Sequence, residues 1–221
     1  NGFISTMYPT GYDPKLKWEE TTTWNAGFDF AFLNNRITAS IDYYLRKSKD
    51  LLSYVSVPSG SSTTNMMNQN IGTLKNEGIE FSITARPIVT NDFTWTASYN
   101  VAYNKNRITK LNNDGSYIET GGISSGNGNN CQVQAVGHPV NSFFLFEQVY
   151  DKNGKPLEGV YVDQNGDGVI NDDDRRIRHS KDPKVTMSFS STFNWKNWDL
   201  GFALHANIGN YVYADAMSDH S

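Results

Sequence analysis

The chain lacks several features on which common protein classes depend. It has one cysteine, Cys131, so it forms no internal disulfide, and the surrounding Asn and Gly residues predict an incidental loop thiol. No apolar run approaches the roughly 18 residues of a transmembrane helix, although spanning strands need only about 9–11 residues. With 19 basic and 23 acidic residues the net charge is -4, which provides no basic surface for nucleic acid.

A recognisable catalytic constellation is also missing. The sequence contains no G-x-S-x-G elbow, phosphate-binding loop or H-E-x-x-H motif. Its four histidines have no metal-ligand spacing. Acidic residues are plentiful, but no two of them stand out as a pair for glycoside hydrolysis. The sequence therefore predicts a protein that is not an enzyme.

What the chain does contain is strict alternation of apolar and polar residues. In segments 24–32 and 93–103 every second residue is apolar or aromatic, and nearly every residue between is small or polar. A period of two indicates a β-strand with two chemically different faces. Aromatic residues make up 13% of the chain, yet its mean hydropathy is -0.56. A barrel wall with lipid on one side and water on the other reconciles these two values.

The alternating segments form three predicted hairpins, at about 21–52, 76–105 and 185–209. Their tight turns are expected at Asn34-Asn35, at 90–92 and at Lys196-Asn197, and Asn tolerates the left-handed backbone of short hairpin turns. Gly, Pro, Asn and Asp break the pattern elsewhere and predict long loops at about 53–75 and 106–184.

Tight turns that alternate with long loops are typical of bacterial outer-membrane barrels, whose periplasmic turns are short and extracellular loops long. A soluble sandwich also uses alternating strands, but these strands exceed the usual 5–6 residues. Aromatic residues gather at the tight-turn ends, as an interfacial girdle requires: Phe32, Phe93, Trp95, Trp195 and Trp198.

The predicted fold class is all-β, an antiparallel meander of long hairpins that forms part of a large transmembrane β-barrel. Six strands alone would leave unpaired edges in lipid, so the functional unit is expected to contain more chain. The polar positions of the strands are expected to face the lumen, and they include Asn25, Asp29, Asp42, Asn100 and His205.

An acidic segment from Asp163 to Asp174 is the sharpest local motif. It matches the D-x-[DN]-x-[DN]-G calcium loop at its first six positions, and Gly168 permits the bend. The expected ligands are Asp163, Asn165, Asp167, the Val169 carbonyl, Asn171 through water, and Asp174. The alternative is a solvated acidic turn in which Asn-Gly and Asp-Gly serve only turn geometry. The sequence favours a structural Ca²⁺ that stiffens the loop.

Many spaced motifs together resemble the SusC/RagA-type TonB-linked outer-membrane proteins of Bacteroidetes. They begin with Leu16-Lys17-Trp18-Glu19 and Asn25-Ala26-Gly27-Phe28-Asp29, and continue in order over nearly the whole chain. Later motifs include Asn76-Glu77-Gly78-Ile79-Glu80-Phe81, the acidic loop, and Asn194-Trp195-Lys196-Asn197-Trp198. Segment 137–143 departs from the family's G-x-P-x-G-S-F by having Asn141 in place of glycine.

The resemblance implies a late portion of a barrel of the 22-stranded type. Such barrels import oligosaccharides or peptides across the outer membrane, beneath a SusD-like surface lipoprotein and driven by TonB. The plug domain, the TonB box and the final strands are missing from this sequence, so TonB is expected to act through the missing N-terminal region. The alternative function is a soluble calcium-dependent β-rich module that binds glycans.

Overall fold

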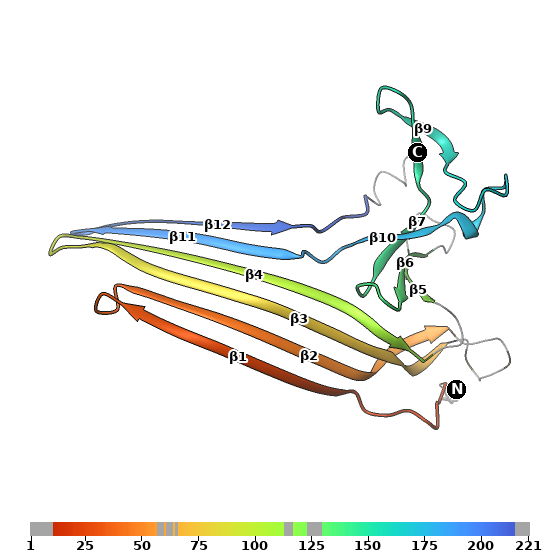
Figure 1. Ribbon diagram of the computed structural model, residues 1–221, viewed down its shortest axis with the longest axis horizontal. Coiled ribbons are helices and arrows are strands. Elements are labelled where there is room, and N and C mark those ends of the chain that lie inside the picture. Colours follow the sequence, from red (N-terminus) through yellow and green to blue (C-terminus); the bar gives the residue numbers. More distant parts are fainter. Residues whose placement is uncertain are drawn as a thin grey trace, which may run out of the picture.

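A computed structural model describes residues 11–56, 60, 64, 66–112, 117–122 and 130–214. Its main feature is a six-stranded antiparallel sheet with the strand order β1-β2-β3-β4-β11-β12 (Figure 1). The strands are β1 (Glu20–Phe32), β2 (Ile37–Ser56), β3 (Met66–Val89), β4 (Phe93–Leu111), β11 (Val185–Trp195) and β12 (Trp198–Ile208). Within the described ranges no helix is long and apolar enough to cross a membrane.

The three predicted hairpins are present, and their turns lie at one end of the sheet (Figure 1). In the first turn Asn34 and Asn35 have φ angles of 54° and 62°, the left-handed geometry for which Asn is suited. Lys196 in the third turn has a φ of 54°, and its N–H donates to the Asp92 carbonyl at 2.9 Å. This hydrogen bond joins the second and third turns.

The register of the ladders keeps one face of the sheet apolar across all six strands. One row of directly opposed residues contains Phe28, Ile41, Phe81, Val101, Met187 and Ala206. Large side chains on this face are uncovered, with Phe28 at 68% and Leu200 at 66% exposure. Because so large an apolar surface is unfavourable in water, the face is suited to lipid.

Aromatic side chains gather at the tight-turn ends of the second and third hairpins. Trp95 stacks on Phe193 with ring centroids 5.7 Å apart, and Trp195 lies opposite both Phe93 and Trp198. Phe32, at the first turn, stacks with Phe30 instead and lies in the row of Ala97, four residues short of Phe93. Barrel strands tilt and stagger, so the ends of successive hairpins are offset along the ladder.

Pro87 explains an irregularity near the end of β3. The ladder with β4 shifts between Ala85 and Ile88, so that β3 has one residue more than its partner. Proline has no N–H to donate, and a bulge is one of the few places where a sheet accepts it. The preceding Arg86 N–H instead donates to the Arg36 carbonyl at 2.7 Å, on the side of β2.

The predicted long loops are wrong in extent. β2 continues to Ser56 and β3 begins at Met66, so most of segment 53–75 is strand, although residues 57–59, 61–63 and 65 lie outside the described part. Apolar and polar residues do not alternate in this region, so the period-two signal is lost. Backbone pairing alone extends these strands, through bulges near Asp50, which has a φ of 53°.

The predicted loop 106–184 is also largely structured. β4 extends to Leu111, and the segment contains two small sheets and a 3-10 turn. One sheet has the order β10-β7-β6-β5 and the other pairs β8 with β9. Their bounds are β5 (Tyr117–Gly122), β6 (Asn130–Ala135), β7 (Ser142–Leu145), β8 (Gln148–Tyr150), β9 (Pro156–Tyr161), η1 (Asp172–Asp174) and β10 (Arg176–Ser180).

We call the β5-β6-β7-β10 sheet the cap sheet. Its buried cluster consists of Val133, Ala135 and Phe144, with Ile177 packed against it. Cys131 belongs to this sheet, because it lies in β6 and is 6% exposed, and its thiol donates to the Gly121 carbonyl at 3.2 Å. The prediction of a loop thiol is therefore wrong, since the polar neighbours of Cys131 conceal a short strand.

The cap sheet is attached to the edge of β4 beyond the point where β11 leaves it. The Ile108 N–H donates to the His138 carbonyl and the Gly137 N–H to the Ile108 carbonyl, both at 2.9 Å. Asn141 adopts a φ of 54°, so it takes the left-handed conformation for which the family pattern has glycine. Its side-chain oxygen also accepts from the buried Gln134 amide at 2.5 Å, which fixes this turn on β6.

Replacing Gly78 by alanine is expected to destabilise the sheet. A Cβ at Gly78 would lie 2.5 Å from the Tyr44 hydroxyl oxygen and 2.6 Å from the Tyr103 carbonyl oxygen. Such overpacking costs about 1–3 kcal/mol, so Gly78→Ala should lower the midpoint of heat unfolding of the full-length protein in detergent. The midpoint is read from the electrophoretic shift between the folded and unfolded barrel.

Gly201→Ala in β12 is the matched control. A Cβ there would lie 3.6 Å from the nearest atom, Thr192 Oγ1, which is ordinary contact. Both substitutions remove the same chain freedom from the unfolded state. Equal midpoints for the two variants would contradict the expected clash at Gly78.

Candidate functional site on the polar face of the sheet

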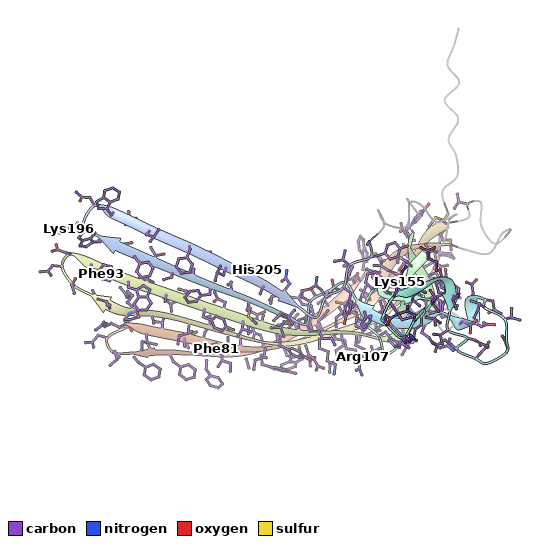
Figure 2. All side chains as sticks on the ribbon, turned by 90° about the horizontal axis from the view of Figure 1, so that it is seen from above. Phe81, Phe93, Arg107, Lys155, Lys196 and His205 are labelled. Carbon is purple, nitrogen blue, oxygen red and sulfur yellow. The ribbon has the colours of Figure 1, made fainter. Side chains whose placement is uncertain are left out.

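The polar face of the six-stranded sheet carries the candidate binding site. Successive ladders align one row of polar residues across all six strands: Asp29, Ser40, Ser82, Asn100, Ser188 and His205. The five positions that the sequence predicts on the lumen side, Asn25, Asp29, Asp42, Asn100 and His205, all lie on this face. Figure 2 shows Phe81 and His205 near the middle of the sheet, between the hairpin turns at one end and the cap sheet at the other.

Short hydroxyl side chains pair across neighbouring strands of this face. The hydroxyls of Ser40 and Ser82 are 2.7 Å apart, and those of Thr84 and Ser98 are 2.9 Å apart. Cross-strand hydroxyl pairs of this kind support the ladder. Because these side chains are small, they project little from the sheet and leave space for the longer polar side chains of neighbouring rows.

A hollow lies over the part of this face nearer the cap sheet. Eight residues line it: Thr23, Asn25, Asp42, Tyr44, Arg46, Asn76, Glu80 and Asn104. An adjoining hollow shares Asp42 and Glu80 with it and also reaches Asn100 and His205. The Tyr44 hydroxyl donates to the Asn104 side-chain oxygen at 3.0 Å, which orients the amide.

The two carboxylates of the hollow are available to a ligand. In the described part of the chain the ion pairs involve other residues, and neither Asp42 nor Glu80 takes part in one. A guanidinium, Arg46, lines the same hollow. Carboxylates accept hydrogen bonds and a guanidinium donates them, so the wall offers both kinds of partner to a polar solute.

Six residues of the hollow are not among the five predicted lumen positions: Thr23, Tyr44, Arg46, Asn76, Glu80 and Asn104. In β1, β2 and β4 these residues have the same parity as a predicted lumen residue, and in β3 Asn76 and Glu80 have the opposite parity to the apolar Ile79 and Phe81. This parity is the signal that could have found them. Parity alone does not show which residues of different strands lie side by side. The ladder register supplies that information: Asn25, Tyr44, Gly78 and Asn104 form one row.

The acidic segment folds as a tight turn in which side chains accept from the backbone. The Asp163 carboxylate accepts from the N–H groups of Gly166 and Gly168, at 2.6 and 2.8 Å. Asp167 accepts from the Val169 N–H at 2.8 Å, and its other oxygen accepts from the Asn165 amide at 3.0 Å. Asp163, Asn165 and Asp167 are therefore held in one turn.

Asp174 is the buried residue of this segment and connects its two ends by hydrogen bonds. Its side chain is fully buried, and it accepts from the N–H groups of Gln164 at 2.7 Å and Asn171 at 3.0 Å. The hydrogen bond from Asn171 holds the pKa of the Asp174 carboxyl below its usual value, against the opposing effect of burial. The side chain of Asn171 caps η1 by accepting a hydrogen bond from the Asp173 N–H at 2.8 Å. Val169, the remaining residue of the predicted ligand set, is exposed.

The acidic segment also differs from the side-chain clusters that usually hold a metal ion. No group of three or more His, Cys, Asp and Glu side chains in the described residues is arranged to hold a metal ion. The three carboxylates of the predicted ligand set, Asp163, Asp167 and Asp174, are therefore not gathered around one point, and an amide and a backbone carbonyl would supply the rest of the set. Oxygen ligands of mixed kind are what Ca²⁺ uses.

Arg175 fastens the acidic segment to the cap sheet. Its guanidinium donates to the carbonyls of Phe144 and Asn130, forms an ion pair with Glu119 at 3.3 Å, and lies 4.3 Å from the centre of the Phe144 ring. Its side chain is only 10% exposed. A planar guanidinium can reach all these partners at once, which an ammonium group cannot.

Three features define this chain as part of the wall of an outer-membrane β-barrel. They are the exposed apolar face, the polar face with its hollows, and the tight turns at one end of the sheet. Comparison with known proteins identifies the family. Residues 2–219 match the family model of the TonB dependent receptor-like β-barrel, and the chain belongs to this family. Because outer-membrane barrels have short periplasmic turns and long extracellular loops, we expect the turns at the periplasmic end of the sheet and the cap sheet at the extracellular end.

The chain is similar to TonB-dependent receptors, among them SusC, and to the structure of RagAB. The chain is 49% identical to the TonB-dependent receptor SusC of Bacteroides thetaiotaomicron over 98% of its length, and 33% identical to the TonB-dependent receptor P3 of Formosa agariphila over 96%. It aligns with the structure of the RagAB peptide transporter at a TM-score of 0.71, with 26% identity over 89% of this chain.

The chain spans about a fifth of the length of these relatives: 22% of both receptors and 22% of the RagAB chain. Family membership confirms the predicted all-β fold class, the SusC/RagA resemblance and the outer-membrane location. It also rules out the alternative of a soluble calcium-dependent module, because this sheet is part of a membrane barrel.

Replacing Arg175 is expected to loosen the acidic segment from the cap sheet. Arg175→Lys removes the fork that reaches Phe144 and Asn130 and leaves buried carbonyls without a donor, at about 1–3 kcal/mol for each. Hydrogen exchange of the backbone amides in β6 and β7 should become faster in the full-length protein. The adjacent Arg176 donates only to the nearby Asp173 and Arg175 carbonyls, so Arg176→Lys is the control. Unchanged exchange in the Arg175 variant would contradict the anchoring role.

Proposed function

We propose that this chain is part of the barrel wall of a TonB-dependent outer-membrane transporter that imports oligosaccharides or peptides. The transporter works with a SusD-like surface lipoprotein and is driven by TonB through a region N-terminal to this chain. The observation that carries the proposal is the polar hollow on the lumen face, backed by an apolar face toward lipid. The similarity to SusC and to the RagAB peptide transporter supports it.

The chemistry of the hollow fits a neutral or mildly cationic polar solute. Asp42 and Glu80 accept hydrogen bonds, Arg46 donates them, and Asn25, Asn76 and Asn104 do both. Oligosaccharide hydroxyls and peptide groups also act both as donors and as acceptors. Weak, replaceable contacts of this kind bind a solute without trapping it, which import requires.

The described residues of the hollow favour binding over catalysis. The wall residues of the hollow belong to different strands and hold one another only through the Tyr44–Asn104 hydrogen bond. A nucleophile beside a base, as covalent catalysis needs, is not among them. The proposed role of the hollow is therefore binding and passage.

Removing the two carboxylate charges is expected to weaken uptake. Hydrogen bonds to charged groups contribute about 1.5–3 kcal/mol, so the double variant Asp42→Asn/Glu80→Gln should need at least about tenfold more substrate for half-maximal uptake. The measurement is import of labelled oligosaccharides and labelled peptides by cells that express the full-length transporter and its lipoprotein partner.

Asp92→Asn provides the control, because Asp92 lies in the exposed turn at the far end of the sheet. The surface amount of each variant is compared by immunoblot. If the double variant takes up substrate like the unaltered transporter, these two carboxylates do not contact the solute during import. If the unaltered transporter imports neither class of compound, the proposal itself fails.

We also propose that the segment from Asp163 to Asp174 holds a structural Ca²⁺. Asp163, Asn165, Asp167, the Val169 carbonyl and Asp174 would supply the oxygens, with Asn171 acting through water. The fit rests on the turn itself: Gly166 and Gly168 take φ angles of 77° and 80°, which allows three alternate side chains to converge. The ion would neutralise part of a strongly acidic segment and hold it against Arg175 and the cap sheet.

Calorimetric titration of the full-length protein with CaCl₂ tests this site. We expect binding heat that Asp167→Ala abolishes, because that side chain is a direct ligand and not part of the buried anchor. Asp151→Ala is the control, since Asp151 accepts from the N–H groups of Asn153 and Lys155 in a separate plain turn. Absence of binding heat in the unaltered protein would show that the segment is only an acidic turn.

A further inference from the structure

Basic side chains gather where the apolar face of the sheet ends. Lys47, Lys75 and Arg107 lie directly opposite one another on β2, β3 and β4. Lys105 lies opposite Glu77 in the adjacent row of the same face. Like charges placed directly opposite each other in a sheet are destabilising. Their alignment across three strands therefore indicates that an anion compensates them.

The orientation of this basic row follows from strand parity. Lys47 is two residues from Leu45, and Arg107 is four residues from Tyr103, with no register shift between them. Leu45 and Tyr103 belong to the apolar face, so the basic side chains point outward, away from the lumen. The row lies at the end that carries the cap sheet, as Figure 2 shows for Arg107. It is thus at the extracellular border of the lipid-facing band.

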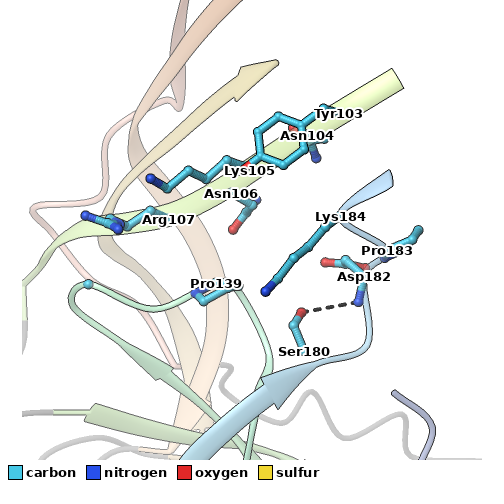
Figure 3. A pocket seen from close by; sticks show the side chains of 11 residues that line it. Tyr103, Asn104, Lys105, Asn106, Arg107, Pro139, Ser180, Asp182, Pro183 and Lys184 are labelled. Carbon is cyan, nitrogen blue, oxygen red and sulfur yellow. Dashed lines mark hydrogen bonds between the residues drawn. The ribbon is translucent and has the colours of Figure 1, made fainter. Parts of the chain in front are cut away.

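A cleft opens beside this row where β11 diverges from β4. Lys105 and Arg107 of β4 lie on one side, and Asp182 and Lys184 of the segment before β11 lie on the other (Figure 3). Pro139 closes the end toward the cap sheet. The cleft is held open by backbone contacts on both sides, from the Asn104 N–H to the Lys184 carbonyl at 3.0 Å and from the Ile108 N–H to the His138 carbonyl.

The protein neutralises only part of this positive charge. Lys75 pairs with Glu77 at 2.8 Å, and Asp182 pairs with Lys181 at 3.1 Å. Lys47, Lys105, Arg107 and Lys184 are exposed, and no side chain in the described part of the sequence forms an ion pair with any of these four. Four cations outside any ion pair therefore lie near one another, and Glu77, which lies opposite Lys105, is the carboxylate beside them.

We propose that this basic cleft binds the anionic, phosphate-bearing headgroup of a lipid in the outer leaflet. A headgroup lies at the height where an apolar band ends, and its acyl chains would continue along the outward face of β3 and β4. Basic side chains beside a membrane attract anionic lipid with about 1 kcal/mol each, and Arg pairs with phosphate through two hydrogen bonds. Tyr103, at the border of the band, has the amphipathic ring that the headgroup region favours.

Lipid retention by the full-length protein tests the proposal without any transport measurement. The protein is reconstituted into nanodiscs of phosphatidylcholine with phosphatidylglycerol, released into detergent, and analysed by native mass spectrometry for bound phosphatidylglycerol. We expect Lys105→Gln/Arg107→Gln/Lys184→Gln, which removes three cleft cations that form no ion pair, to bind it about a hundredfold more weakly, or about fivefold for each charge removed. Heat unfolding checks that the variant barrel is folded.

The control variant Lys15→Gln/Lys152→Gln/Lys155→Gln removes three exposed charges elsewhere in the chain. It should retain the lipid like the unaltered protein. Equal retention by the unaltered protein and the first variant, or equal loss in both variants, would overturn the proposal. So would displacement of phosphatidylglycerol by excess inorganic phosphate, because the cleft would then be a site for free phosphate.

Discussion

The hydrogen-bonded ladder is the constraint on which the rest of this structure depends. Lipid offers no partner to a backbone N–H or carbonyl, so every strand within the membrane must be paired on both sides. Within this sheet β2, β3, β4 and β11 meet this requirement along their shared length, whereas β1 and β12 are the edge strands and have one partner each. Where β11 leaves β4, the cap sheet takes over, through the hydrogen bonds of Ile108 with Gly137 and His138. The cap sheet is thus built on the same strand edge.

The ladder also determines how the two faces of the sheet are used. Side chains alternate along a strand, and the register lines them up from one strand to the next, so a single alternation creates a lipid face and a lumen face together. On the lumen face, glycines opposite large side chains leave space for them: Gly78 lies under Tyr44 and Gly27 lies beside Asp42. The hollow and the carboxylate and amide groups that line it are therefore formed by a single layer of strands.

Much of the fold was predictable because its strongest signal is local. The hairpins, the turns at Asn34-Asn35 and Lys196-Asn197, and the lumen side of Asp29 or His205 follow from period-two alternation and turn chemistry. The signal fails beyond the lipid band, where both faces are wet. There the sequence could not show that β2 and β3 continue, that Cys131 is buried in a strand, or that Asn141 takes over the backbone conformation of glycine.

The sequence by itself determined the class of this protein, the two faces of its strands and the acidic turn, since each depends on residues close together along the chain. Only the tertiary structure decided which of those residues act together. Asp42 meets Glu80 and Arg46 in one hollow, Lys47 meets Lys75 and Arg107 in one row, and Arg175 reaches the carbonyls of β6 and β7. These groupings depend on ladder register between distant segments, and a shift by one residue would turn every side chain to the other face.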